Sequence, residues 1–446
     1  MRHLLTAALA ITGLTGCASL QTLGPRSAAV ALVAANLPDG FVATNQLSRA
    51  NFTPDPLLND LLARVPNTPD VSISAARLAE ARARLAAARA GLLPRVQGSA
   101  SLAGSDGDNA SSINSGSLGI GLDVPLDFFG TNRTRTSAAQ ARAEEAAFNQ
   151  DRVSALTRAT LNDLYVALRT AQNQTSVTME SLDSANDTLS LATSRQRAGL
   201  ETGLGVAQAT SNRDAIAARL PSFAQAEIAA RLGLEALLGD LPHAQLERLS
   251  PKGQIPRFDL ARADVAPAQW VRMRADITAA GRRLTAAGLN ARAAQLDRYP
   301  TVSLDGLING SEASRGPTGI IGSLSANLLS TLFDFGRLQA LANAADALAQ
   351  VEARLYRQLV LNALAQVETQ ASAVRRGQDA LIAQSANVAS ARDQAQLARV
   401  RYTSGLSSFL DVLTAERGAY DAQSAQVAAT GETARAEVGL ILALGY

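Results

Sequence analysis

The chain has few of the residues that usually build catalytic or metal sites. Among its 446 residues there is one cysteine, Cys17, and there are two histidines, His3 and His243. One cysteine cannot form a disulfide within the chain, and this set cannot supply the ligands of a structural zinc site. The Gly-x-Ser-x-Gly motif of serine hydrolases is also missing. We therefore expect no enzyme, no cofactor and no metal site.

An excess of one charge and long apolar runs are missing as well. The 41 basic and 39 acidic residues leave a net charge of +2, and this balance argues against a nucleic-acid partner. After residue 16, no stretch reaches the roughly 18 consecutive apolar residues that indicate a transmembrane helix. Any part of the chain that spans a membrane would therefore have to consist of β-strands.

Residues 1–16 have the pattern of a cleaved targeting segment. A basic start at Arg2 is followed by an apolar run over residues 4–14. The next word, Leu14-Thr15-Gly16-Cys17, resembles the lipobox of bacterial lipoproteins. That resemblance implies cleavage before Cys17, acylation of this cysteine with chains such as palmitate and, because residue 18 is alanine, anchoring in outer-membrane lipid. The alternative is a chance cysteine behind an ordinary secretion signal.

The rest of the chain repeats itself at an offset of 206 residues, the difference between the positions of Pro94 and Pro300. The same offset relates three pairs of glycines: Gly130 and Gly336, Gly199 and Gly405, and Gly239 and Gly445. A fixed long period indicates that one structural unit occurs twice. The chain therefore divides into a signal peptide (1–16), a lipidated lead-in (17–69), a first repeat (70–241), a linker (242–275) and a second repeat (276–446).

In each repeat, two short segments alternate between apolar and polar residues. The apolar positions are Val96, Gly98, Ala100 and Leu102; Leu118, Ile120, Leu122 and Val124; Val302, Leu304 and Ile308; and Leu324, Ala326 and Leu328. This alternation predicts β-strands with one apolar face and one face of serine, glycine, asparagine and aspartate. Turn-rich stretches at 104–116 and 310–319 join the two strands of each pair.

The predicted strands are about nine residues long, which is the length of a tilted strand that crosses a membrane. A soluble sheet with one solvated face alternates in the same way. The N-terminal anchor and the near absence of charge from the apolar faces favour the membrane. Backbone groups in lipid must all be paired, and the smallest membrane barrels have about eight strands. Four strands therefore predict a barrel that several chains share.

The segments that follow the strands predict very long helices. Residues 131–197 contain neither glycine nor proline, and residues 338–405 contain a single interior glycine, Gly377. A coiled-coil-like seam in the second segment consists of Leu341, Leu348, Val351, Leu355 and Leu359. A helix of about 67 residues is roughly 100 Å long. Tight turns at Gly199 and Gly405 then lead into return helices over residues 204–238 and 410–444.

Several words of the sequence, together with the repeat, resemble the TolC-type outer membrane factors and within them the lipoprotein branch that serves multidrug efflux. These words are Asp55-Pro56-Leu57, Leu93-Pro94, Phe333-Asp334-Phe335-Gly336-Arg337, Arg401-Tyr402-Thr403-Ser404-Gly405 and Asp411-Val412-Leu413-Thr414-Ala415. The resemblance covers about residues 52–446 and implies a mainly α-helical protomer with four transmembrane strands. Three such chains would form a homotrimer, with one shared β-barrel in the outer membrane and an α-helical barrel through the periplasm.

The same resemblance implies a passive, gated duct that exports small molecules from a tripartite pump. A periplasmic adaptor, or membrane fusion protein, and an inner-membrane transporter of the RND type would be its partners. Asp411 matches one aspartate of the ring that closes the periplasmic aperture, Thr414 occupies the second position of that ring, and Leu410 adds an apolar constriction. Asp411 is equally well explained as an ordinary residue at a helix N-terminus.

The turns at the ends of the long helices match the tips on which the adaptor docks. Their residues are Gly199, Leu200, Ser404, Gly405 and Leu406, although turn chemistry alone also accounts for them. Two other functions stay open: a similar duct for type I protein secretion, and a structural lipoprotein that bridges the envelope without conducting. The paired strands argue against the second, because a tether needs no barrel, and the lipobox favours drug efflux over secretion.

Overall fold

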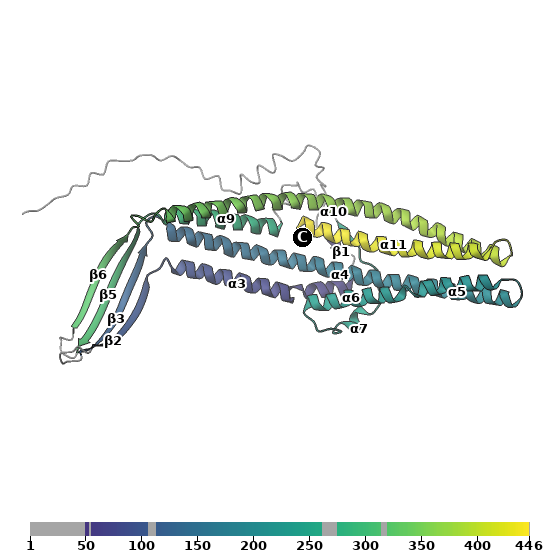
Figure 1. The fold of residues 1–446 in the computed structure, drawn as a ribbon, viewed down its shortest axis with the longest axis horizontal. Helices are drawn as coiled ribbons and strands as arrows, with labels where there is room; N and C mark the ends of the chain where they lie inside the picture. The colour runs from purple at the N-terminus through teal and green to yellow at the C-terminus, as the bar shows by residue number, and fades with distance from the viewer. Residues whose placement is uncertain (1–49, 53–54, 106–112, 261–273, 314–318, 446) are drawn as a thin grey trace, which may run out of the picture.

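The protein is elongated, with a small β-sheet at one end and helical turns at the other (Figure 1). The computed structural model describes residues 50–52, 55–105, 113–260, 274–313 and 319–445. Within these ranges, every helix is too short or too polar to cross a membrane. The long axis follows two helices of 67 residues each, α4 (Thr131–Arg197) and α10 (Arg337–Thr403), as predicted from their lack of helix breakers.

The structural elements recur at the same long offset as the residues of the sequence. In the first repeat, α3 (Pro69–Ala90), β2 (Arg95–Ser105) and β3 (Ile113–Leu126) precede α4. In the second, α9 (Ala275–Leu296), β5 (Thr301–Ala313) and β6 (Gly319–Leu329) precede α10. Each of these elements begins 206 residues after its counterpart. The family-like order of helix, two strands, long helix and return helix therefore occurs twice.

The return helices differ between the two repeats. In the second repeat, α11 (Phe409–Leu444) is continuous. In the first, the prediction of one helix over residues 204–238 is wrong, because α5 (Gly203–Ala217) ends and α6 (Leu220–Leu238) begins after a break at Ala218 and Arg219. Pro221 lies in the first turn of α6, where its missing N–H and fixed φ are tolerated. The equivalent position in α11 is Val427, which does not interrupt the helix.

The four long strands form one antiparallel sheet in the order β2-β3-β5-β6. Their register places the predicted apolar residues opposite one another, for example Val96 opposite Leu122 and Val124 opposite Leu304. The predicted apolar face is thus confirmed, while further apolar residues, among them Leu307, Ile321 and Leu329, lie on the otherwise polar face. Within the described residues, β2 and β6 each pair on one side only, so the sheet has two free edges.

The strands are longer than the prediction of about nine residues. They contain 11, 14, 13 and 11 residues, and the predicted turn residues Gly104, Gly116 and Gly310 lie inside them. Pairing continues through these glycines because each contributes a backbone N–H and C=O to the ladder whatever its side chain. On the polar face, cross-strand contacts such as the 2.7 Å hydrogen bond between the hydroxyls of Ser101 and Ser117 accompany the pairing.

The helices of the half nearer the sheet form a layer in the order α3, α4, α9, α10, in which each helix packs on the next. In the other half, α11 packs on α10, and α5 and α6 pack on α4. Many buried side chains are alanines, such as Ala286 and Ala293 of α9, which allow close helix packing.

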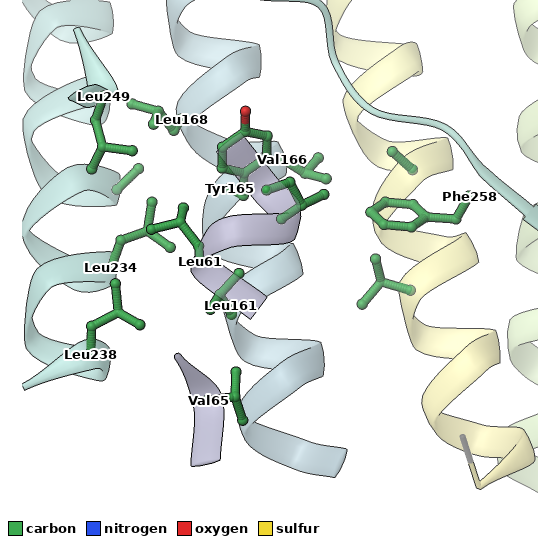
Figure 2. Packing of buried hydrophobic residues seen from close by; sticks show 14 of the residues in the cluster. Leu61, Val65, Leu161, Tyr165, Val166, Leu168, Leu234, Leu238, Leu249 and Phe258 are labelled. Carbon is green, nitrogen blue, oxygen red and sulfur yellow. The ribbon is translucent and has the colours of Figure 1, made fainter. Parts of the chain in front are cut away.

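The largest apolar cluster lies where the lead-in and the linker pack on α4 (Figure 2). It joins Leu61 of α2 (Pro56–Ala63), Val65 of the short helix η1 (Val65–Asn67), Tyr165 and Leu168 of α4, Leu234 of α6, Leu249 of α7 (Leu246–Leu249) and Phe258 of β4 (Phe258–Leu260). Strand β1 (Ala50–Phe52) of the lead-in pairs antiparallel with β4 of the linker. The sequence predicted neither of these two short strands.

A buried polar network supports this cluster. The Tyr165 hydroxyl donates to Asp55 Oδ2 at 2.5 Å, while Asp55 Oδ1 caps α2 by accepting from the Leu57 N–H at 3.0 Å. Arg169 donates to the Tyr165 hydroxyl and to the Pro251 carbonyl, each at 2.6 Å. Burial and the bond to Asp55 raise the pKa of Tyr165. The network thus ties the lead-in and the linker to one point on α4.

Candidate gate and docking site at the helix tips

Both long helices end in the same hydrogen-bonded turn. At the end of α4, the Gly199 N–H donates to the Gln196 carbonyl at 3.0 Å, and the Leu200 N–H donates to the Arg195 carbonyl at 2.8 Å. Two equivalent bonds, also 3.0 and 2.8 Å long, close α10 around Gly405. The two glycines have φ values of 72° and 75°, a left-handed conformation that a Cβ atom would strain.

These turns confirm the predicted ends of the long helices. They lie at the end of the molecule farthest from the sheet (Figure 1). The predicted docking residues are all at these two turns: Gly199, Leu200, Ser404, Gly405 and Leu406. Leu200 and Leu406 are 66% and 69% exposed. Single exposed leucines are common on protein surfaces, so docking of an adaptor at these turns stays a prediction.

Asp411 lies in the first turn of α11, where it forms a capping box with Ser408. The Asp411 N–H donates to Ser408 Oγ at 3.3 Å, and the Ser408 N–H donates to Asp411 Oδ2 at 2.9 Å. The hydrogen bonds from Ser408, together with the charge of Arg401, hold the pKa of Asp411 below its usual value. The side chain is exposed, so Asp411 both caps its helix and presents a fixed negative charge to solvent.

The other two predicted gate residues lie beside Asp411. Leu410 is 58% exposed, and Thr414 is exposed one turn further along α11. The Thr414 hydroxyl donates to the Leu410 carbonyl at 2.8 Å, so it is bound within its own helix. Residues three and four apart share one helix face, so the structure brings Leu410, Asp411 and Thr414 together on one exposed surface.

A contact between the two hairpins lies next to this surface. The Tyr402 hydroxyl of α10 donates to Glu201 Oε2 in the turn after α4 at 2.7 Å. The Arg195 guanidinium stacks over the Tyr402 ring, 4.6 Å from its centroid. The Tyr402 ring also packs against Phe409, with the centroids 5.2 Å apart. We call the residues Arg195, Glu201, Tyr402 and Phe409 the clasp, because they join the tip of one hairpin to the tip of the other.

Electrostatics favours the closed clasp. The hydrogen bond from Tyr402 lowers the pKa of Glu201, so the acceptor stays ionised at neutral pH. Burial and the bond to Glu201 raise the pKa of Tyr402 to about 12, so the donor stays protonated. A hydrogen bond between a neutral hydroxyl and a carboxylate is charge-assisted and stronger than one between neutral groups. The clasp therefore persists over the whole physiological pH range.

A second set of contacts joins the hairpins further from the tips. The Thr188 hydroxyl of α4 donates to Glu416 Oε1 of α11 at 2.7 Å. Arg417 of α11 donates to Asn212 Oδ1 of α5 at 2.7 Å. Burial raises the pKa of Glu416 although Thr188 and Arg399 oppose the shift. The two hairpins are thus held together at more than one level.

The sequence did not point to the clasp. Tyr402 occurred among the words that carried the resemblance, but no role followed for its hydroxyl, and Glu201 was not singled out. The repeat could have drawn attention to Glu201. The equivalent position in the second repeat is Ser407, so only the first repeat has a charge there. The predicted lipidation site, Cys17, lies outside the described residues.

A mainly helical chain, with one four-stranded sheet at the end of two long hairpins, has the fold of TolC-like outer-membrane channels. The chain belongs to the outer membrane efflux protein family, which matches residues 57–240 and 267–446. This finding confirms the family that the sequence words indicated.

Individual relatives agree with this assignment. The pyoverdine export outer membrane protein OpmQ of Pseudomonas putida is 30% identical over 400 residues, which are 85% of this chain and 83% of that protein. The cation efflux system protein CusC of Escherichia coli K12 is 27% identical over 396 residues, 85% of this chain and 84% of that protein. The solved outer-membrane channel OprN matches with a TM-score of 0.81 and 29% identity, covering 88% of this chain and 90% of that chain.

Proposed function

We propose that the chain is one protomer of a homotrimeric outer-membrane duct, the passive and gated exit of a tripartite efflux pump. A periplasmic adaptor protein and an inner-membrane transporter of the RND type would complete the pump. The sheet carries this proposal, because it combines an apolar face with two free edges among the described residues. Strand edges in lipid must be paired, so β6 of one protomer would pair with β2 of the next. Membership in the efflux family supports the same assignment.

The helices offer a second surface for assembly. On α10, the predicted seam residues Leu341, Val351 and Leu355 are 52%, 50% and 50% exposed in the protomer. A row of half-exposed apolar side chains on a long helix is expected to pack on another helix. In a closed ring of three layers, α10 of one protomer would meet α3 of its neighbour. The sheet and the helices would then close in the same assembly.

The gate would form where three copies of the helix tips converge. Three copies of Asp411 would repel one another and attract cations, and three copies of Leu410 would narrow the same aperture. Opening would require the hairpins to move apart, which the Tyr402–Glu201 bond of the clasp opposes. An adaptor that docks on the exposed Leu200 and Leu406 would act next to that bond.

An anchor at Cys17 completes the proposal. Acylation at Cys17 would hold the N-terminus in the same membrane that the strands cross, and two or more acyl chains give stable anchoring. Mass spectrometry of the mature N-terminus should detect acyl groups on Cys17, and an unmodified cysteine there would exclude the anchor. The duct itself would catalyse no reaction, since the pump supplies the energy.

The names of two relatives help to decide between efflux and the two alternative functions. The name of one describes pyoverdine export and the name of another a cation efflux system, so cargo differs within the family. Both names describe small cargo, which favours efflux over a duct for type I protein secretion. A non-conducting structural lipoprotein would have no use for a sheet with one apolar face and free edges.

Two measurements on the full-length protein test the proposal. The native mass in mild detergent should correspond to three protomers, and the purified protein should form pores in planar lipid bilayers. A monomer that forms no pores would leave the sheet edges without partners and would favour the structural lipoprotein. A trimer with pores, isolated together with an ATP-driven exporter instead of an RND transporter, would favour the secretion duct.

A further inference from the structure

A groove of about 610 Å³ crosses the helix layer in the half of the molecule nearer the sheet. Residues of α3, α4, α9 and α10 all line it. Within the layer, α3 packs on α4, α4 on α9 and α9 on α10, so the groove runs across the layer and not between two helices alone. It lies far from the tips and takes no part in the proposed gate.

Arginines dominate the charge of this groove. Its charged lining consists of Arg77 of α3, Arg142 and Arg152 of α4, and Arg283 of α9, opposed by Glu145 of α4 and Glu352 of α10. Arg283 donates to Glu145 at 2.7 Å, which neutralises that pair. In the part of the chain that the structure describes, the other three arginines form no ion pair and are exposed. Four arginines and two glutamates leave two net positive charges per groove.

The periodicity of α4 shows which side of the layer the groove is on. Successive residues of an α-helix are about 100° apart, so positions seven apart share a face and positions two apart lie on opposite faces. Tyr165 holds the lead-in through Asp55, and Gln172, seven residues later, donates to the Leu249 carbonyl of the linker at 2.9 Å. Arg142 lies 23 residues before Tyr165, so at about 100° per residue the two positions are about 140° apart around the helix axis. The groove and the packed lead-in therefore lie on opposite faces of α4.

This placement assigns the groove to the lumen. In the proposed trimer the helix layers close into a tube, and a folded lead-in and linker on its inner side would obstruct the passage. We therefore place them on the outside, so that the opposite face, with the groove, lines the passage. Three protomers would place three such grooves around the lumen, all at the same height and each with the same excess of positive charge.

We propose that these arginine grooves give the duct a preference for anionic cargo, namely small molecules that carry carboxylate, phosphate or sulfate groups. The inference rests on the proposed function, since it needs the lumen. Guanidinium groups bind such anions with paired hydrogen bonds and keep their charge at any physiological pH. A concave surface lined by one sign of charge focuses its field and raises the local concentration of oppositely charged solutes. Because salt screens charges beyond about 8 Å, the grooves act on cargo that passes close to the wall.

Three variants of the full-length protein distinguish anion binding by the groove from the effect of removing positive charge anywhere on the protein. The groove variant, R77Q/R142Q/R152Q, removes the three unpaired arginines. The outer control, R158Q/R354Q/R357Q, removes the same charge from three exposed arginines on the opposite faces of α4 and α10. The lysine variant, R77K/R142K/R152K, keeps the groove charge and loses only the paired geometry. None of these residues belongs to the clasp or the gate.

Two readouts test the proposal. The first is binding of a trisulfonated pyrene dye to the protein in detergent, with an uncharged pyrene as the reference ligand. We expect the dissociation constant of the anionic dye to rise about fivefold or more in the groove variant, and to change little in the outer control. The second is the reversal potential of bilayer pores under a tenfold KCl gradient, which should shift towards cation preference in the groove variant alone. The lysine variant should keep the wild-type reversal potential.

Each outcome decides a different point. If the groove variant binds the dye as wild type does, or the outer control loses binding equally, the anion preference is wrong while the duct stands. If no variant forms pores but only the groove variant loses dye binding, the proposed duct is wrong while the anion site stands. A weaker dye affinity in the groove variant without any change in reversal potential would show a binding site that does not face the passage, and would overturn its assignment to the lumen.

Discussion

At the scale of single residues, two carboxylates near the tips carry opposite pKa shifts. Asp411 is exposed and accepts hydrogen bonds from Ser408, which lower its pKa, whereas Glu416 is half-buried, and burial raises its pKa. Asp411 and Glu416 are only five positions apart in α11. Even so, Asp411 stays ionised, whereas ionisation of Glu416 costs folding free energy. The environment, and not the type of side chain, decides which role each can have.

The charge of Asp411 can be separated from its capping bond. We expect both Asp411→Ala and Asp411→Asn to raise the conductance of the reconstituted channel by about twofold or more, since a ring of like charges would be removed from its narrowest part. Ser408→Ala breaks the capping box but keeps the charge, so its conductance should equal that of wild type. Planar bilayer recordings make the comparison. Equal conductance in all four proteins would exclude Asp411 from the gate.

Glu416 predicts a pH-dependent stability difference. Because its pKa is raised on folding, the folded state holds the proton more tightly than the unfolded state. The ionised carboxylate therefore destabilises the fold above the folded-state pKa, and this effect vanishes below the usual value of 4.5. Thr188, Arg399 and Asp187 are the groups that act on it. Glu416→Gln, which can still accept from Thr188, should raise the thermal midpoint at pH 7.5 and leave it unchanged at pH 4.

A calorimetric scan of wild type and Glu416→Gln at both pH values tests this. Glu432 is an exposed glutamate on the same helix. The control substitution Glu432→Gln should leave the thermal midpoint unchanged at both pH values. A stabilisation by Glu416→Gln that is equal at both pH values would show that ionisation is not the cause.

At the scale of elements, the two hairpins contact each other at several levels, and the clasp is the contact at their tips. The clasp joins the two tips through one charge-assisted hydrogen bond and the stacking of Arg195 and Phe409 on Tyr402. A buried apolar cluster that includes Ala192, Ala209 and Val412 packs beside the clasp. Separation of the tips would therefore have to break both the hydrogen bond and this apolar contact.

We expect Tyr402→Phe to raise channel conductance, because it removes the bond while it keeps the ring stack. Glu201→Gln weakens the same bond from the other side and should have a similar effect. The double variant should conduct about as well as either single variant, since two changes in one interaction are not additive. Additive increases in bilayer recordings would mean that Tyr402 and Glu201 act independently.

The close packing of α10 on α11 leaves no room for a side chain at Gly377. A Cβ atom at Gly377 would lie 2.6 Å from Thr433 Oγ1, whereas a Cβ at Gly418 of α11 would contact nothing within 4 Å. Gly377→Ala should therefore destabilise the protein by roughly 1–3 kcal/mol through overpacking. Gly418→Ala should stabilise it by roughly 0.5–1 kcal/mol, because alanine has the better helix propensity. Denaturant unfolding measures both, and stabilisation by Gly377→Ala would contradict the packing.

At the scale of the whole molecule, the protomer has features that it cannot satisfy alone. The sheet has two free edges among the described residues, and the α10 seam exposes half of Val351 and Leu355. The arginine groove occupies only one part of the circumference that a tube would have. The strand edges and the α10 seam both find partners when copies of the chain close into a ring, and this agreement between independent elements is the physical argument for assembly.

Substitution on the α10 seam should separate folding from assembly. Val351→Asp combined with Leu355→Asp places charges on side chains that are half-exposed in the protomer, so the helical content should persist. The trimer should be lost, because an interface cannot bury unpaired carboxylates without a large cost. Gln350→Asp, on an exposed position of the same helix, is the control. Circular dichroism and native mass measure the two effects, and a trimeric double variant would place the interface elsewhere.

Much of the fold could be predicted from the sequence, because its signals are local and periodic. The absence of glycine and proline over residues 131–197 predicted the full extent of α4, and the alternation around Leu118 and Leu324 predicted one face of the sheet. The repeat doubled each of these signals. The errors concern proline and glycine: the break before Pro221 divides the first return helix, and the glycines predicted as turns continue the strand pairing.

Of the candidate site, the sequence by itself determined the turns at Gly199 and Gly405 and the position of Asp411 one turn into the next helix. These depend on hydrogen bonds between residues a few positions apart. Only the tertiary structure decided that Glu201 meets Tyr402 and that Arg142 and Arg283 line one groove. Such contacts join residues more than a hundred positions apart, and they depend on the rotation of each helix about its axis as it packs. That rotation is set by the fit of side chains across the whole layer, which no local pattern specifies.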